Sequence, residues 1–157
     1  MSIRCCQVTA ANTGLLFYRY LHSLGFKWLS ARGFSRSACR YGVYVGHGSK
    51  IGAGLKFPHP TTIVIGRHVI IGNNARIFQQ VTIGGLPKGR TGLLVRMGDN
   101  VTVFHGAKFI GTGCVGSNVV VGANGVVTKP FGDNVVLAGV PARVIRSLDV
   151  DISARQI

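Results

Sequence analysis

The sequence has 157 residues, a length typical of one domain, and 46% of them are hydrophobic, which excludes a disordered chain. It carries 18 Lys and Arg against four acidic residues, a formal net charge of +14, which predicts an anionic partner: a phosphate-bearing cofactor, nucleic acid or a membrane surface. The acids are all Asp, with no Glu, so a paired-carboxylate glycosidase and a carboxylate-rich metal site are disfavoured.

The first 40 residues are expected to form a helical lead. Apolar side chains recur at helical spacing over residues 14–40, and Gly25 and Gly33 divide this segment into short helices. Charged residues interrupt it too often for a secretory signal or a transmembrane helix. The four Cys form no CxxC pair, as in proteins that keep reduced thiols. We expect a cytoplasmic protein and leave open a peripheral contact of the basic lead with the inner membrane face.

A six-residue repeat fills the middle of the chain. From Val45 to Val127 an aliphatic residue, in most units followed by a small one, recurs every six residues apart from two longer steps. One unit fits a short strand and a tight turn, and three units close a triangular coil of about 18 residues whose inward side chains stack on the next coil. The pattern predicts an all-β fold, a left-handed parallel β-helix (hexapeptide repeat), preceded by the short N-terminal helical segment.

The repeat is expected to end at Lys129 and Pro130. Residues 141–146 are then expected to form a turn and a last short element, and the remaining residues a frayed tail. The predicted organisation is therefore a helical lead (1–40), a β-helix domain (41–146) and a C-terminal tail (147–157).

His59 lies at one of the two places where the repeat is longer than six. The step from Phe57 to Ile65 is eight residues, so the coil must bulge outward there, and Pro58 and Pro60 restrict the backbone on both sides of the histidine. Imidazole can take a proton from a hydroxyl at neutral pH and return it to a leaving thiolate. His59 is therefore our candidate general base.

Several motifs, in order, resemble one known family. The run KIGAGLKFPHPTTIVIGRHVIIGNNARIFQQVTIGG is followed by MGDNVTV, GAKFIG, VGANGVVTKP and AGVPARVI. Together they resemble the hexapeptide-repeat acyltransferases of the serine acetyltransferase type. The resemblance implies a homotrimer with acetyl-CoA in the groove between subunits, and it places His59 on the catalytic histidine.

The resemblance also implies the residues that contact the donor. Small residues would line the pantetheine groove and basic residues would hold the phosphates of coenzyme A; the expected set is Gly85, Gly106, Ala107, Lys108, Gly122, Ala123, Lys129 and Arg143. His105 takes the place of a small residue and is a second catalytic candidate. No Cys lies near the bulge, so direct transfer is expected rather than an acyl-cysteine route. The histidines lack the spacing of the related zinc enzymes, so no metal is expected.

The sequence departs from the family at the acceptor. Tyr44 and Pro58 stand where the serine acetyltransferases have Asp, Leu93 and Leu94 stand where they have an Arg-His pair, and Arg67 replaces a Glu. A zwitterion would lose its partners there. The remaining features are similar to the branch that acetylates sugar hydroxyls in polysaccharide assembly.

The sequence therefore predicts an O-acetyltransferase that moves an acetyl group from acetyl-CoA to a hydroxyl of a sugar or polysaccharide precursor. Three alternatives stay open: a serine O-acetyltransferase, an amino-sugar N-acetyltransferase, and a non-catalytic β-helix scaffold subunit. Nucleic-acid binding is not expected, because no recognised motif accompanies the charge.

Overall fold

The computed structural model describes residues 42–46, 48–84 and 95–148. The predicted helical lead, Gly85, Leu93, Leu94 and most of the predicted tail lie outside the described residues. In chain order the elements of the described part are β1 (Val43–Val45), β2 (Lys50–Ile51), β3 (Ile63–Ile65), β4 (Ile70–Ile71), β5 (Arg76–Ile77), β6 (Thr82–Gly84), β7 (Arg96–Met97), β8 (Thr102–Val103), β9 (Lys108–Ile110), β10 (Val120–Val121), β11 (Val126–Val127), β12 (Val135–Ala138) and β13 (Arg143–Ser147).

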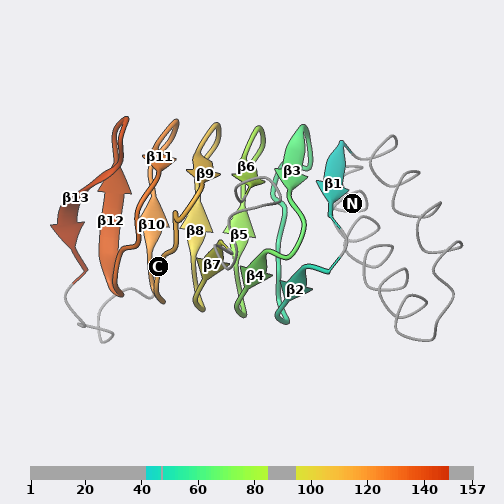
Figure 1. The fold of residues 1–157 in the computed structure, drawn as a ribbon, viewed down its shortest axis with the longest axis horizontal. Coiled ribbons are helices and arrows are strands. Elements are labelled where there is room, and N and C mark those ends of the chain that lie inside the picture. Colours follow the sequence, from blue (N-terminus) through green and yellow to red (C-terminus); the bar gives the residue numbers. More distant parts are fainter. Residues whose placement is uncertain (1–41, 47, 85–94, 149–157) are drawn as a thin grey trace, which may run out of the picture.

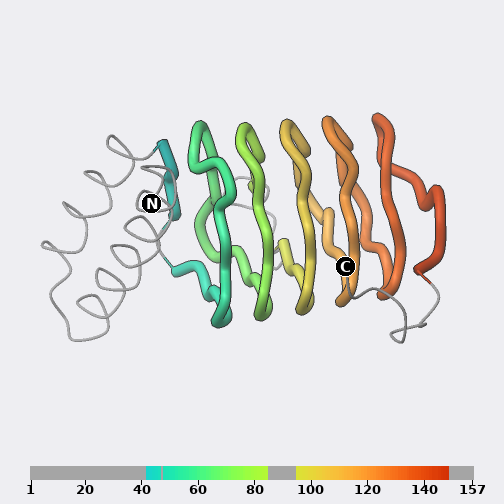
Figure 2. Tube along the Cα trace, turned by 180° about the vertical axis from the view of Figure 1, so that it is seen from behind, coloured from blue at the N-terminus to red at the C-terminus, as the bar shows by residue number. Residues whose placement is uncertain are grey.

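The strands form three sheets that wind as a β-helix. Sheet A has the order β1-β3-β6-β9-β11, sheet B the order β2-β4-β7, and sheet C the order β13-β12-β10-β8-β5. The chain runs from sheet A through B to C and then enters the next coil, and all pairs except β12 with β13 are parallel. Figures 1 and 2 show the coils stacked along one axis, with β13 at the far end from β1. The predicted all-β parallel coil is confirmed.

Inward side chains stack in columns, as the six-residue period predicts. In sheet A, Val45 pairs with Ile65, Ile65 with Ile83, Ile83 with Phe109 and Phe109 with Val127. Every member of this column is at most 5% exposed. The core is thus a continuous stack in which each coil covers the one before it, and burial of these side chains supplies the main stabilisation.

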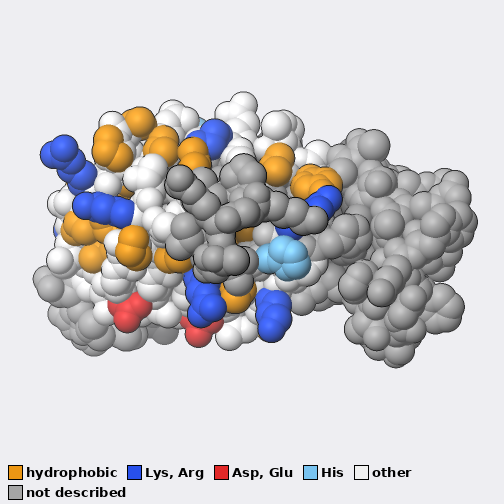
Figure 3. Space-filling model, viewed as in Figure 1, with side chains coloured by type: hydrophobic (Ala, Val, Ile, Leu, Met, Phe, Trp, Pro, Cys, Tyr) orange, Lys and Arg blue, Asp and Glu red, His pale blue; other side chains and the backbone are white. Residues whose placement is uncertain are grey.

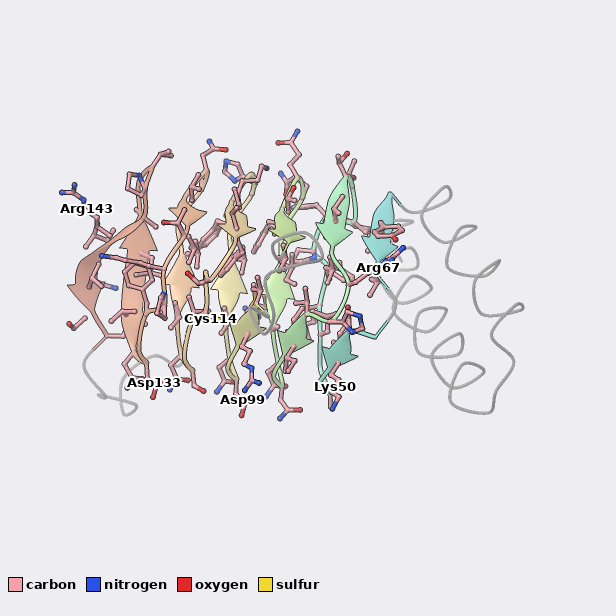
Figure 4. The ribbon with its side chains drawn as sticks, in the orientation of Figure 1. Lys50, Arg67, Asp99, Cys114, Asp133 and Arg143 are labelled. Carbon is pink, nitrogen blue, oxygen red and sulfur yellow. The ribbon has the colours of Figure 1, made fainter. Side chains whose placement is uncertain are left out.

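The corner between sheets B and C is a ladder of side-chain amides. Its members, in order, are Asn74, Asn100, Asn118 and Asn134, and the side-chain amide of each of the first three donates to the amide oxygen of the next at 3.0 to 3.3 Å. All four have a positive φ of 55° to 56°, which Asn tolerates better than most residues. Asp99 and Asp133 accept backbone N–H groups at the same corner. Acidic side chains accordingly lie along the lower edge in Figure 3, and Figure 4 labels Asp99 and Asp133 at that edge.

The repeat continues past Lys129 and Pro130, contrary to the prediction. Phe131 forms a parallel bridge with Val115, which itself bridges Met97 of sheet B. In the same coil β12 pairs with β10 in sheet C. Pro130 lies in an exposed corner between sheets A and B, where a missing N–H removes no ladder hydrogen bond, so it does not terminate the coil. The expected last element is β13, which turns back antiparallel on β12. Among the described residues, no helix is long and apolar enough to cross a membrane.

Candidate active site

In every coil the chain passes from sheet C to sheet A at one edge of the β-helix, which we call the C–A corner. His59 lies in this corner in the first described coil. Lys56 pairs with Arg76 and Val64 with Thr82, so this corner takes eight residues where the next coil takes six. The two extra residues therefore fall in the C–A corner, where the eight-residue step predicted a bulge. His59 is exposed, whereas Phe57 just before it is fully buried and anchors the segment.

Backbone hydrogen bonds hold the segment around His59. The N–H of Thr61 donates to the carbonyl of His59 at 2.8 Å, and the N–H of Gln80 donates to the carbonyl of Thr61 at 3.0 Å. Thr62 has a φ of 53°, a turn conformation that a threonine rarely adopts. The corner of the next coil thus fixes the backbone that carries the candidate base.

Aromatic rings continue the C–A corner beyond His59. The His59 ring lies 6.1 Å from the Phe78 ring at an interplanar angle of 57°, and Phe78 stacks on Phe104 at 5.1 Å and 22°. Phe104 is 38% exposed, so the stack presents apolar surface at the corner. Sequence reasoning missed Phe78; the signal was that it holds the same repeat position as Phe104, directly after an inward Ile or Val.

The predicted small residues lie on the same corner, in the second and third coils after that of His59. Gly106 donates its N–H to the carbonyl of Gln79 at 3.1 Å and has a φ of 71°, while Ala107 is fully buried. Gly122 and Ala123 occupy the corner one coil further on. These small residues allow the next coil to pack closely, because a Cβ at Gly106 would clash with the side chain of Asn124 and one at Gly122 would lie 3.2 Å from the carbonyl oxygen of Leu137.

His105 lies on the same edge of the β-helix as His59, but in the second coil after it. The N–H of Gln80 bonds to Thr61, that of Gly106 to Gln79, and that of Asn124 to His105. Successive corners therefore bring Thr61, Gln79 and His105 to equivalent positions, with Gln79 between the other two. Among the described residues, the side-chain oxygen Oε1 of Gln79 is buried and has no hydrogen-bond partner. His105 is exposed, and its catalytic role stays a prediction.

The predicted phosphate ligands do not converge in the described part of the chain. The Lys108 ammonium donates to the carbonyls of Gln80 at 2.8 Å and Gly106 at 3.0 Å, so it braces the C–A corner. Lys129 lies in the corner between sheets A and B, with its ammonium 5.6 Å from the centre of the Phe131 ring. Arg143 is exposed on β13 (Figure 4). Their contacts with coenzyme A stay predictions.

No described carboxylate lies at the C–A corner. Asp99 and Asp133 are at the corner between sheets B and C, and Tyr44 is 43% exposed on the outer face of sheet A, in register with Val64. Cys114 lies near sheet B, where its Sγ accepts the N–H of Arg96 at 3.4 Å. Among the described residues there is no group of three or more His, Cys, Asp or Glu that could hold a metal ion.

Comparisons with known proteins point to one family. No family model matches the sequence. The chain is 36% identical over 121 residues to a serine acetyltransferase of Staphylococcus aureus (strain N315), across 76% of this chain and 57% of that protein. It is 36% identical over 135 residues to a serine acetyltransferase of Helicobacter pylori (strain J99), across 83% of this chain and 78% of that protein. The chain thus spans little more than half the length of the Staphylococcus relative.

Solved structures agree. The serine acetyltransferase of Brucella abortus strain S19 in complex with coenzyme A has a TM-score of 0.83 and 30% identity, covering 90% of this chain and 56% of that chain. The serine acetyltransferase of Neisseria gonorrhoeae in complex with serine has a TM-score of 0.81 and 29% identity, covering 89% of this chain and 57% of that chain.

Proposed function

Because the chain belongs to the serine acetyltransferase family, we propose that it transfers an acetyl group from acetyl-CoA to a hydroxyl, with His59 as general base. The observation that carries the proposal is the inserted C–A corner, which exposes His59 on a backbone held by hydrogen bonds to the next coil. The small residues of the following corners lie on the same edge and support a donor lying along it. The neighbour in complex with coenzyme A supports the choice of donor.

In this mechanism His59 takes the hydroxyl proton while the acceptor oxygen forms a bond to the thioester carbon. The carbon–sulfur bond then breaks, and His59 returns the proton to the departing thiolate of coenzyme A. Backbone N–H groups near the corner would stabilise the oxyanion. Cys114 lies near sheet B and not at the C–A corner. This placement supports direct transfer rather than an acyl-cysteine route.

L-Serine is the first acceptor that we propose. The sequence analysis placed a sugar hydroxyl first, but the relatives are serine acetyltransferases and one structural neighbour is in complex with serine. The comparisons therefore favour the serine alternative over the polysaccharide branch.

A sugar hydroxyl is the second candidate, because of the ring stack. The Phe78 ring lies beside His59 and stacks on Phe104, whose ring is 38% exposed and suits an acceptor with an apolar ring face. Serine has no such face. An amino-sugar nitrogen would be acetylated by the same chemistry and is an arm of the test.

Other features of the family resemblance remain part of the proposal. These are a homotrimer of left-handed coils, a donor groove between subunits, and phosphate contacts from Lys108, Lys129 and Arg143. A cytoplasmic location and a peripheral membrane contact through residues 1–40 stay expectations, the latter outside the described residues.

The deciding experiment is thiol release from acetyl-CoA against a panel of acceptors. The panel contains L-serine, neutral oligosaccharides and amino sugars, and mass spectrometry identifies the acetylated product. Saturable O-acetylation of serine supports the first acceptor, and saturable acetylation of a sugar hydroxyl supports the second. Failure to release thiol with any acceptor, in protein that still binds acetyl-CoA, favours the scaffold alternative.

A further inference from the structure

Two cations lie side by side on the outer face of sheet C, immediately before the C–A corner. Lys56 forms a parallel bridge with Arg76, and the N–H of Ile77 donates to the Lys56 carbonyl at 2.9 Å. Both side chains are exposed, whereas Phe57 and Ile77, next in each strand, are fully buried. Neighbouring strands are about 4.8 Å apart, so the two side chains leave the sheet next to each other.

No acidic side chain of the described residues lies on this face beside the pair. The outer positions in register along sheet C are Lys56, Arg76, Thr102, Val120 and Val136. The two acids in the described part of the chain accept backbone N–H groups at the corner between sheets B and C instead. Like charges directly opposite one another destabilise a sheet, and an anion between them removes that cost.

The pair is close to the candidate base along both strands. Lys56 precedes His59 by three residues, so their Cα atoms are at most about 11 Å apart. Arg76 precedes Phe78 by two residues, and the Phe78 ring is the one beside His59. An acceptor whose hydroxyl meets His59 therefore has its other end within reach of two long cationic side chains.

We propose that Lys56 and Arg76 bind a carboxylate of the acceptor, which makes the substrate an anionic hydroxy compound. This inference rests on the proposed function and deepens it. At the two positions where the resemblance expects an Arg-His pair, this chain has Leu93 and Leu94. A serine carboxylate thus needs another cation, and the Lys56–Arg76 pair supplies two, one of them a guanidinium that can bind a carboxylate bidentately.

The test compares L-serine with L-serine amide, which keeps the hydroxyl and the amine but lacks the carboxylate charge. We expect the wild type to prefer serine by about 10- to 100-fold in kcat/KM, the range for a charge-assisted contact. Lys56→Gln and Arg76→Gln should each reduce that preference by about tenfold or more, through KM for serine, with KM for acetyl-CoA unchanged. Lys56→Arg should retain it.

Lys50→Gln is the matched control, because Lys50 is an exposed cation at the start of a strand in sheet B. It should leave the preference unchanged. Equal use of serine and its amide by the wild type, or a rise in KM for acetyl-CoA in the Gln variants, would overturn the inference; the latter result would assign the pair to the phosphates of the donor.

Calorimetry of serine and serine amide binding separates this inference from the proposed function. If no acceptor is acetylated but serine binds more tightly than its amide, and Lys56→Gln abolishes the difference, the carboxylate site stands while the proposed function fails. If neither compound binds, or both bind equally, the carboxylate site is refuted whatever the activity.

Discussion

Replacing His59 by Ala tests the proposed mechanism most directly. A general base contributes about 10²- to 10⁴-fold to turnover, which corresponds to about 3 to 5 kcal/mol of transition-state stabilisation. His59 is exposed, and the ring contact seen for it is with Phe78 at 6.1 Å. Loss of such a contact should change the free energy of unfolding by less than about 1.5 kcal/mol. The effect on turnover should thus exceed the effect on stability.

The assay measures three quantities on wild type and His59→Ala: kcat for thiol release, the Kd for acetyl-CoA by calorimetry, and the urea midpoint. His68→Asn is the matched control, because His68 is also an exposed corner histidine and its φ of 58° suits Asn. We expect only His59→Ala to lose turnover, with acetyl-CoA affinity and urea midpoint close to wild type in both variants. A kcat within tenfold of wild type for His59→Ala would refute the role of His59 and make His105 the next candidate.

The remaining predictions concern the rest of the corner and the core. His105→Ala tests the second catalytic candidate by steady-state kinetics: because Gln79 separates its position from the His59 segment, we expect kcat to fall by less than tenfold, and a larger loss would support a catalytic role for His105. Phe109→Ala should lower the free energy of unfolding by about 3 to 5 kcal/mol in urea titrations, because Phe109 is fully buried between Ile83 and Val127. Asn100→Ala should cost about 1 to 3 kcal/mol, since it removes two amide contacts and puts Ala at a φ of 55°, and Asn100→Gly should cost less because glycine adopts that φ freely. Equal losses for the two Asn100 variants would show that the ladder, not backbone strain, dominates.

The six-residue period predicted the coils and the place of the bulge, because both depend on which side chains point inward. A register slip would expose the whole column through Ile65, Ile83 and Phe109, so the aliphatic spacing alone determines the stacking. The eight-residue step located the exposed His59 for the same reason. The sequence was misleading at Pro130, since a proline in a corner and a proline in a ladder look alike until the hydrogen bonds are known.

Long polar side chains were harder to predict. The period places Lys108 on the outer face of sheet A, but it does not say that its ammonium turns to the carbonyls of Gln80 and Gly106. Lys56 and Arg76 are 20 residues apart, and only the register makes them neighbours. Interactions that depend on side-chain direction or on strand pairing therefore needed the structure.

The separation of acids from the candidate base has a consequence for the chemistry. Asp99 and Asp133 belong to the ladder between sheets B and C, whereas His59, the ring stack and the Lys108 ammonium share the C–A corner. An imidazolium formed at His59 therefore has no described carboxylate to stabilise it. In the proposed mechanism its counter-charge is first the oxyanion of the tetrahedral intermediate and then the thiolate that forms when the carbon–sulfur bond breaks, which takes the proton back. Cys114, near sheet B, does not share the corner of His59, and this placement supports return of the proton to the thiolate of coenzyme A in a direct transfer rather than an acyl-cysteine route.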